Sequence, residues 1–147
     1  MYKRQPAGNI HAVDTSLDPA AAAAAYQQQI EAVVEKDSAG IPMFDLMVLG
    51  MGDDGHTASI FPHQMELLAS EKICEVATHP VSGQKRVTVT GLVISASKEI
   101  CFLITGANKA DVLGQILNDQ PSSEQYPTRH FSDLTTTKFW VDSATGA

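Results

Sequence analysis

Cysteine and long apolar runs are both scarce in this sequence, and each shortage excludes a class of protein. Only two cysteines, Cys74 and Cys101, occur among 147 residues, without CxxC spacing, so neither a disulfide framework nor a cysteine-rich metal site is expected. No stretch reaches the roughly 18 consecutive apolar residues of a membrane span. The first nine residues carry positive charge but no apolar segment, unlike a secretory signal. A cytoplasmic protein with buried thiols is expected.

Basic residues are also few, which argues against a nucleic-acid partner. The chain has 10 Lys and Arg against 17 Asp and Glu, for a net charge of −7. Residues 1–80 hold four basic and eleven acidic side chains, whereas residues 81–147 hold six of each, so no basic stripe is present. The balanced second half still permits a pocket for an anionic small molecule. A hydrophobic content of 44% and the chain length indicate one globular domain.

Helical and strand patterns alternate along the chain, which predicts an α/β sheet protein. Asp18 is a good N-cap and Pro19 suits the first helical position, so a helix is expected over residues 19–36. The short apolar runs at 44–49 and 100–104 are typical of parallel strands buried on both faces. Further expected elements are a brief strand at 10–13, a helical turn at 64–69, strands at 73–78, 86–90 and 138–142, a helix at 107–118, and either a strand or a helix at 92–97.

A glycine-rich loop follows the first of these apolar runs. Three glycines within residues 50–55 match G-x-G-x-x-G, and Glu75 lies about twenty residues on, where a dinucleotide-binding fold places its ribose partner. Two features disagree with that interpretation. Pro62 leaves no room for the long helix that should follow. Asp53 and Asp54 would also place negative charge beside the pyrophosphate. A dinucleotide cofactor is therefore not expected.

The same loop carries a histidine at the carboxyl end of a predicted strand, where open α/β sheets bind ligands. Asp54 lies two positions before His56 and is placed to orient the imidazole of a general base. The competing interpretation is that Asp54 caps the turn and His56 lies on the surface, and spacing alone does not separate the two. The other histidines have no i, i+4 partner or cysteine cluster, so no metal site is expected.

The loop sequence GMGDDGHTASIFP, residues 50–62, resembles the signature of the 6-phosphogluconolactonase family, which belongs with the sugar-phosphate isomerases and deaminases. Residues 86–90 (RVTVT) and 102–110 (FLITGANKA) resemble two further family segments, and residues 139–142 resemble its terminal motif. The resemblance covers residues 6 to about 145. Glucosamine-6-phosphate deaminases continue the loop with I-A-F-N-E-P where this chain has TASIFP, which favours the lactonases.

The resemblance implies hydrolysis of 6-phospho-D-glucono-1,5-lactone to 6-phospho-D-gluconate in the pentose phosphate pathway, without metal or cofactor. It makes His56 the general base that activates water, with Asp54 as its partner. The backbone around Gly52 and Gly55, or the guanidinium of Arg86, is the expected donor set for the oxyanion.

Lys109 is expected to anchor the substrate phosphate from the first turn of the helix predicted at 107–118. The expected partner is thus a sugar phosphate, with no nucleic acid or membrane, and the chain is expected to be a monomer or a homodimer.

The sequence departs from the family at its start. Family members begin with a further N-terminal section that carries a G-G-[ST] loop and a D-E-R segment, and nothing in residues 1–17 matches either. We therefore expect a non-family-like start at 1–5 and a partial α/β lactonase-like domain at 6–147. Its Rossmann-like, mostly parallel sheet would be flanked by helices, lack its N-terminal strands and expose an apolar edge or face. The alternative function is a non-catalytic sugar-phosphate-binding or assembly fragment.

Overall fold

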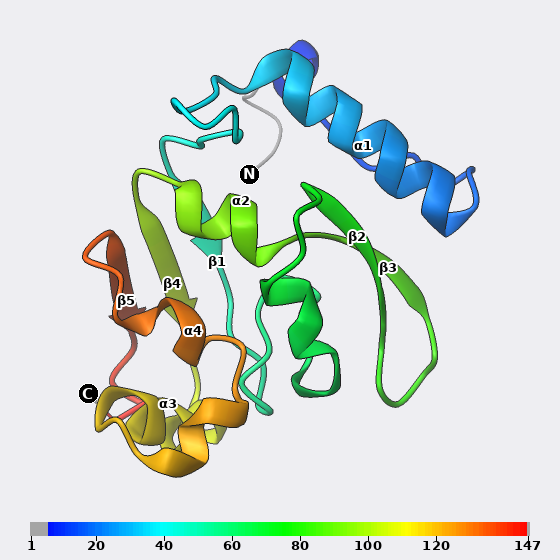
Figure 1. Cartoon of the computed structure of the whole chain (residues 1–147). Coiled ribbons are helices and arrows are strands. Elements are labelled where there is room, and N and C mark those ends of the chain that lie inside the picture. The colour runs from blue at the N-terminus through cyan, green and yellow to red at the C-terminus, as the bar shows by residue number, and fades with distance from the viewer. Residues whose placement is uncertain (1–5, 147) are drawn as a thin grey trace.

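Two sheets organise the fold of residues 6–146, the part of the chain that the computed structural model describes (Figure 1). The non-family-like start expected at residues 1–5 lies outside the described residues. The strands are β1 (Met47–Leu49), β2 (Cys74–Thr78), β3 (Lys85–Val89), β4 (Ile100–Ile104) and β5 (Thr137–Val141). β1, β4 and β5 form a parallel sheet in the order β1-β4-β5, and β2 pairs with β3 as an antiparallel hairpin. The predicted α/β fold with a parallel sheet is confirmed.

The helices agree with most of the expected positions. They are α1 (Pro19–Val33), α2 (Gly91–Ala96), α3 (Ala110–Leu117) and α4 (Arg129–Ser132), with 3₁₀ segments η2 (Ala7–Asn9), η3 (Pro62–Leu68), η4 (Ala107–Lys109) and η5 (Pro121–Gln125). The Asp18 carboxylate caps α1 by accepting the N–H groups of Ala20 and Ala21 at 3.1 and 3.2 Å. The ambiguous segment at 92–97 is the helix α2.

Two sequence expectations near the N-terminus are corrected. The brief strand expected at residues 10–13 is wrong, because this exposed segment pairs with none of the described strands. The first helix ends at Val33 rather than at Lys36, because Lys36 instead forms an antiparallel bridge with Pro42. The chain thereby turns back toward β1.

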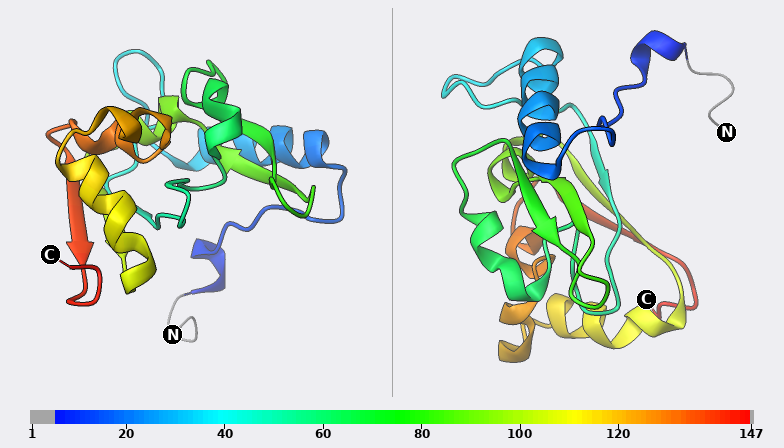
Figure 2. Two further views of the ribbon diagram at one scale, coloured as in Figure 1. Left: turned by 90° about the horizontal axis from the view of Figure 1, so that it is seen from below. Right: turned by 90° about the vertical axis from the view of Figure 1, so that its right-hand side faces the viewer.

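The main hydrophobic core lies on one face of the parallel sheet. Ile100, Phe102 and Ile104 of β4 point into it and are almost fully buried. The Phe102 ring stacks on Phe139 of β5 with 5.2 Å between centroids, and the ring of Phe131 from α4 lies 6.4 Å away. Figure 2 shows α2 and α4 on this side of the strands. Burial of these apolar side chains stabilises the sheet on this face.

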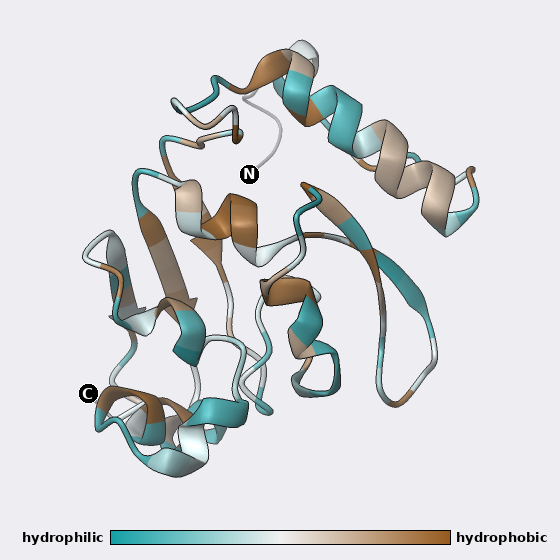
Figure 3. Cartoon of the chain, viewed as in Figure 1, coloured by the Kyte–Doolittle hydropathy of each residue, from teal (hydrophilic) through white to brown (hydrophobic). Residues whose placement is uncertain are grey.

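The opposite face of the same sheet is apolar and exposed. Val48 of β1, Leu103 of β4 and Trp140 of β5 are 54%, 53% and 61% exposed, and Figure 3 colours β1 and β4 as hydrophobic. The expectation that residues 44–49 and 100–104 form strands buried on both faces is therefore wrong, whereas the exposed apolar face expected for the partial sheet is present. It fails because the packed helices of the described chain cover only the face that carries Phe102.

A second, smaller core joins α1 to the β2–β3 hairpin. Ala23 and Ile30 of α1 pack there with Cys74 of β2. Burial, helped by the Glu31 carboxylate, raises the pKa of the Cys74 thiol to about 11, so this cysteine is the buried thiol that was expected. Cys101 is only half-buried. Among the described residues, none of the helices is long and apolar enough to cross a membrane.

The one-sided core predicts opposite outcomes for two neighbouring residues of β4. Phe102→Ala should lower the free energy of unfolding by about 3–5 kcal/mol, because it empties a fully buried site. Leu103→Ala should change it by less than about 1 kcal/mol, because this side chain is half-exposed. Urea titration of both variants measures the difference. Equal losses would contradict a core confined to one face.

Candidate active site

The loop that follows β1 is closed by its own hydrogen bonds. The N–H of Gly52 donates to the carbonyl of His56 at 2.8 Å, and the N–H of Gly55 donates to the carbonyl of Gly52 at 3.1 Å. The hydroxyl of Thr57, which is fully buried, donates to the carbonyl of Gly50 at 2.9 Å. These bonds fix the backbone on both sides of His56, so the loop presents this side chain in a defined position.

A distant segment holds the other side of the loop. The carbonyl of Gly55 accepts hydrogen bonds from both the N–H and the hydroxyl of Thr128, at 3.1 and 2.9 Å. Gly55 has φ +75°, and a Cβ there would lie 2.6 Å from the ring of Tyr126. Glycine is thus required by both conformation and space. Sequence reasoning missed Tyr126 and Thr128, because nothing in a local pattern links residues more than seventy positions apart.

The side chains of His56 and Asp54 form the contact that their spacing in the sequence allowed. Nδ1 of His56 lies 2.6 Å from Oδ1 of Asp54, and the same oxygen accepts the backbone N–H of His56 at 3.1 Å. Burial alone would raise the pKa of Asp54, but these two bonds outweigh it and hold the pKa below its ordinary value. An ionised Asp54 favours the tautomer with the proton on Nδ1, which leaves Nε2 of His56 as the basic nitrogen.

Phe61 supports the imidazole from a different direction. Its ring is buried, and its centroid lies 4.7 Å from that of His56. With Asp54 on Nδ1 and Phe61 against the ring, rotation of the imidazole is restricted. No sequence pattern marks this role, since an aromatic residue just before Pro62 is equally typical of ordinary core packing.

Gly52 makes room for the His56–Asp54 pair. A Cβ at position 52 would lie 2.0 Å from Nδ1 of His56 and 2.7 Å from Oδ1 of Asp54. Both atoms belong to the short contact between the two side chains, so even a methyl group would separate them. Gly50 in the same loop has open space in place of a Cβ.

Lys109 reaches the same loop from the end of β4. Its Nζ donates to the carbonyl of Met51 at 2.7 Å and pairs with Oδ1 of Asp53 at 2.5 Å. Asn108 donates its amide N–H to the same oxygen at 2.8 Å. The bonds from Lys109 and Asn108 hold the pKa of Asp53 below its ordinary value. Asp53 is therefore the direct partner of Lys109, the expected phosphate anchor. In the sequence, Asp53 was notable only as a negative charge that disagrees with a pyrophosphate site.

One cavity brings several of the expected site residues together. It has a volume of about 400 Å³ and is lined by Val48, Leu49, Gly50, Met51, Gly52, His56, Ala58 and Lys109. The candidate base and the candidate anchor thus share one space, with Asp54 behind the base. Within residues 6–146, no group of three or more His, Cys, Asp or Glu side chains is arranged to hold a metal ion.

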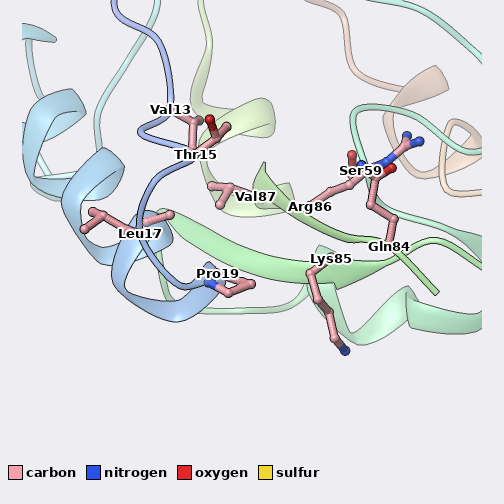
Figure 4. A pocket seen from close by; sticks show the side chains of 10 residues that line it. Val13, Thr15, Leu17, Pro19, Ser59, Gln84, Lys85, Arg86 and Val87 are labelled. Atoms are coloured by element: carbon pink, nitrogen blue, oxygen red, sulfur yellow. The ribbon is translucent and has the colours of Figure 1, made fainter.

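Arg86 lies elsewhere, in the wall of a second cavity of about 400 Å³ between the β2–β3 hairpin and the segment that leads into α1 (Figure 4). Ser59 lines this cavity too, and Lys85 and Arg86 point in different directions from β3. The Cζ atom of Arg86 lies 6.0 Å from the centroid of the Phe61 ring. Phe61 is thus a neighbour of both Arg86 and His56, although these two residues line different cavities.

Comparison with known proteins assigns the chain to a family. The model of the family described as glucosamine-6-phosphate isomerases/6-phosphogluconolactonase matches residues 1–140. The chain belongs to this family. A 6-phosphogluconolactonase from Treponema pallidum is 50% identical over 105 residues, which cover 71% of this chain and 43% of the relative.

Longer matches extend over nearly the whole chain. A 6-phosphogluconolactonase from Nostoc is 36% identical over 143 residues, covering 97% of this chain and 59% of that protein. The crystal structure of the devB protein has a TM-score of 0.87 and 38% identity, covering 96% of this chain and 59% of that one. The chain thus spans about half the length of the curated relatives it matches.

The space around Gly52 yields a test of the His56–Asp54 pair. Gly52→Ala should abolish the hydrogen bond from Nδ1 of His56 to Asp54, because the new methyl group overlaps both atoms. The measurement is the downfield imidazole N–H resonance of His56 in NMR spectra. Gly50→Ala is the matched control and should retain the resonance. If this resonance persists in Gly52→Ala, the His56–Asp54 hydrogen bond does not depend on the absence of a side chain at position 52.

Proposed function

We propose that this chain supplies the active site for hydrolysis of 6-phospho-D-glucono-1,5-lactone to 6-phospho-D-gluconate. The observation that carries the proposal is the His56–Asp54 pair, whose imidazole lines one cavity together with the cation of Lys109. The family assignment and the names of the relatives support the same reaction. A sugar phosphate is accordingly the proposed substrate.

The chemistry begins at Nε2 of His56. With Nδ1–H donated to ionised Asp54, Nε2 takes a proton from water as the water oxygen adds to C1 of the lactone. The imidazolium is stabilised by the Asp54 carboxylate, 2.6 Å from Nδ1. When the tetrahedral intermediate collapses, the bond from C1 to the ring oxygen breaks and the proton passes from Nε2 to that oxygen. The product is the open-chain acid, and His56 returns to its neutral form.

The phosphate is proposed to bind at Lys109. The Nζ atom is already positioned by the carbonyl of Met51, and it reaches the same cavity as His56. Asp53 neutralises part of its charge, so the site holds its cation without a large net positive potential. The distance between base and anchor across the cavity then selects a lactone that carries its phosphate away from the carbonyl carbon.

Gly52, Gly55 and Arg86 have narrower proposed roles. The N–H groups of the two glycines donate within the loop, so these residues are proposed to shape the substrate-facing wall rather than to donate to the oxyanion. Arg86 is proposed to contact the substrate from the neighbouring cavity, past the edge of Phe61.

A second candidate function is binding of a sugar phosphate without turnover. The observation that favours it is Val48, which lines the cavity and is also 54% exposed on the uncovered face of the parallel sheet. A cavity with such an open wall retains the anchor for phosphate but excludes water poorly, which weakens electrostatic catalysis.

The base is tested by removing it. His56→Gln should lower the rate of lactone hydrolysis, followed through coupled oxidation of 6-phosphogluconate and corrected for spontaneous hydrolysis, by about 10²–10⁴-fold. The control is His11→Gln, an exposed histidine outside the cavity, which should retain the rate. Undiminished activity in His56→Gln would contradict the mechanism. If the unaltered chain binds 6-phosphogluconate but does not hydrolyse the lactone, the second candidate is favoured.

The anchor is tested by two substitutions with opposite expected effects. Lys109→Met should weaken binding of 6-phosphogluconate at least tenfold, because it removes the cation in the cavity. Asp53→Asn should tighten binding several-fold, because it removes the negative charge that competes with the phosphate for Nζ but keeps an amide oxygen that can still accept a hydrogen bond from Nζ. Isothermal titration calorimetry measures both. Weaker binding in Asp53→Asn would show instead that Asp53 is needed to position Lys109.

A further inference from the structure

The segments that follow β4 and β5 leave the sheet side by side. The two strands are parallel, with Ile104 opposite Val141 at their carboxyl ends (Figure 1). Asp142 comes directly after β5, and both of its carboxylate oxygens lie 3.2 Å from the backbone nitrogen of Gly106, which donates to them. Gly106 has φ +98° and immediately precedes η4, whose last residue is Lys109. Asp142 therefore binds the backbone at the start of the turn that carries the candidate anchor.

The carboxylate of Asp142 is itself held in place. Its Oδ1 accepts the N–H and the hydroxyl of Thr145 at 2.9 and 2.6 Å. Thr145 is only 3% exposed, and its hydroxyl oxygen lies 3.4 Å from the carbonyl of Ile104, the last residue of β4. The bonds from Thr145 and Gly106 hold the pKa of Asp142 below its ordinary value, so this group is ionised near neutral pH.

The far end of the same turn contacts the loop after β1. The backbone N–H of Lys109 donates to the carbonyl of Gly106 at 3.1 Å, which closes the turn. Asn108 donates to Oδ1 of Asp53 at 2.8 Å, and Nζ of Lys109 donates to the carbonyl of Met51 at 2.7 Å. A connected set of hydrogen bonds thus leads from Asp142 through the turn to the ammonium of Lys109.

We infer that Asp142 is a positioning residue for Lys109, which it places against the loop after β1 by fixing the N–H of Gly106. The stem of a lysine is flexible, so its ammonium has a defined position only where the backbone that carries it is fixed. Asp142 acts through the turn, since the cavity around Lys109 is lined by other residues. The consequence for phosphate affinity rests on the proposed function of Lys109, whereas the position of the ammonium can be measured without a ligand.

The ligand-free measurement uses Asp53. The bonds from Lys109 and Asn108 hold the pKa of Asp53 below its ordinary value. Asp142→Ala should release the turn and raise the pKa of Asp53 toward that ordinary value, which ¹³C NMR of the side-chain carboxyl follows as a function of pH. Asp142→Asn retains an oxygen that can accept the N–H of Gly106, so the pKa of Asp53 should stay closer to that of the unaltered chain.

The consequence for the ligand is measured by isothermal titration calorimetry with 6-phosphogluconate. Asp142→Ala should weaken binding by about three- to tenfold, and Asp142→Asn by less than about twofold, as expected for coupling between connected groups. In a chain that already carries Lys109→Met, Asp142→Ala should cause no further loss, because the group through which Asp142 acts has been removed.

Asp37→Ala is the matched control. Asp37 also accepts two backbone N–H groups, those of Ala39 and Ile41 at 2.9 Å each, but it lies in the turn between α1 and β1. Its loss should change neither the pKa of Asp53 nor the binding of 6-phosphogluconate. Circular dichroism and thermal unfolding establish that each variant is folded. If Asp142→Ala does not fold, Thr145→Val removes the hydroxyl that holds Asp142 and should raise the pKa of Asp53 in the same direction.

Three results would overturn the inference. The first is an unchanged pKa of Asp53 in folded Asp142→Ala. The second is an equal change of that pKa in Asp37→Ala, which would indicate a general loss of stability. The third is a further loss of binding when Asp142→Ala is added to Lys109→Met. A different pattern would separate the two proposals: if Lys109→Met leaves binding unchanged while Asp142→Ala raises the pKa of Asp53, the phosphate anchor fails and the positioning role of Asp142 is supported.

Discussion

The backbone ladder between β1 and β4 runs parallel, with Leu49 opposite Phe102. Because parallel strands end at the same edge of a sheet, the segments that follow them emerge side by side. One segment carries Asp53, Asp54 and His56, and the other carries Lys109. The bond from Nζ of Lys109 to the carbonyl of Met51 then joins the two. A single pairing in the sheet thus assembles the proposed base, His56, and the cation of Lys109 from positions 53 residues apart in the chain.

Local features of the site could be predicted from the sequence. A short apolar run before three glycines placed the loop at the carboxyl end of a strand, and the Asp54–His56 spacing allowed the contact that the structure shows. The position of Lys109 near the start of a helix followed from Gly106 and the helical pattern after it. In each case, residues close in sequence determined the local geometry.

The features that sequence patterns did not predict depend on contacts between segments far apart in the chain. Thr128 and Tyr126 hold Gly55 from the far end of the chain, and no local pattern marks them. The apolar runs of β1 and β4 also predicted strands buried on both faces, but Val48 and Leu103 are exposed. An apolar strand shows that both of its faces favour burial, but whether both are buried depends on the packing layers that the whole assembly provides. Val48 and Leu103 are apolar, yet within residues 6–146 the packed helices cover only the opposite face of the sheet.

Lys109 has three N–H donors on its ammonium group. The carbonyl of Met51 and the carboxylate of Asp53 accept two of them, which leaves the third for the anion that is proposed to bind there. A flexible lysine normally loses considerable side-chain entropy when it binds an anion. In this chain that entropy has already been lost on folding, because two protein oxygens fix the ammonium. A single additional hydrogen bond is then formed without rearrangement, and the anion-binding group is preorganised before any ligand arrives.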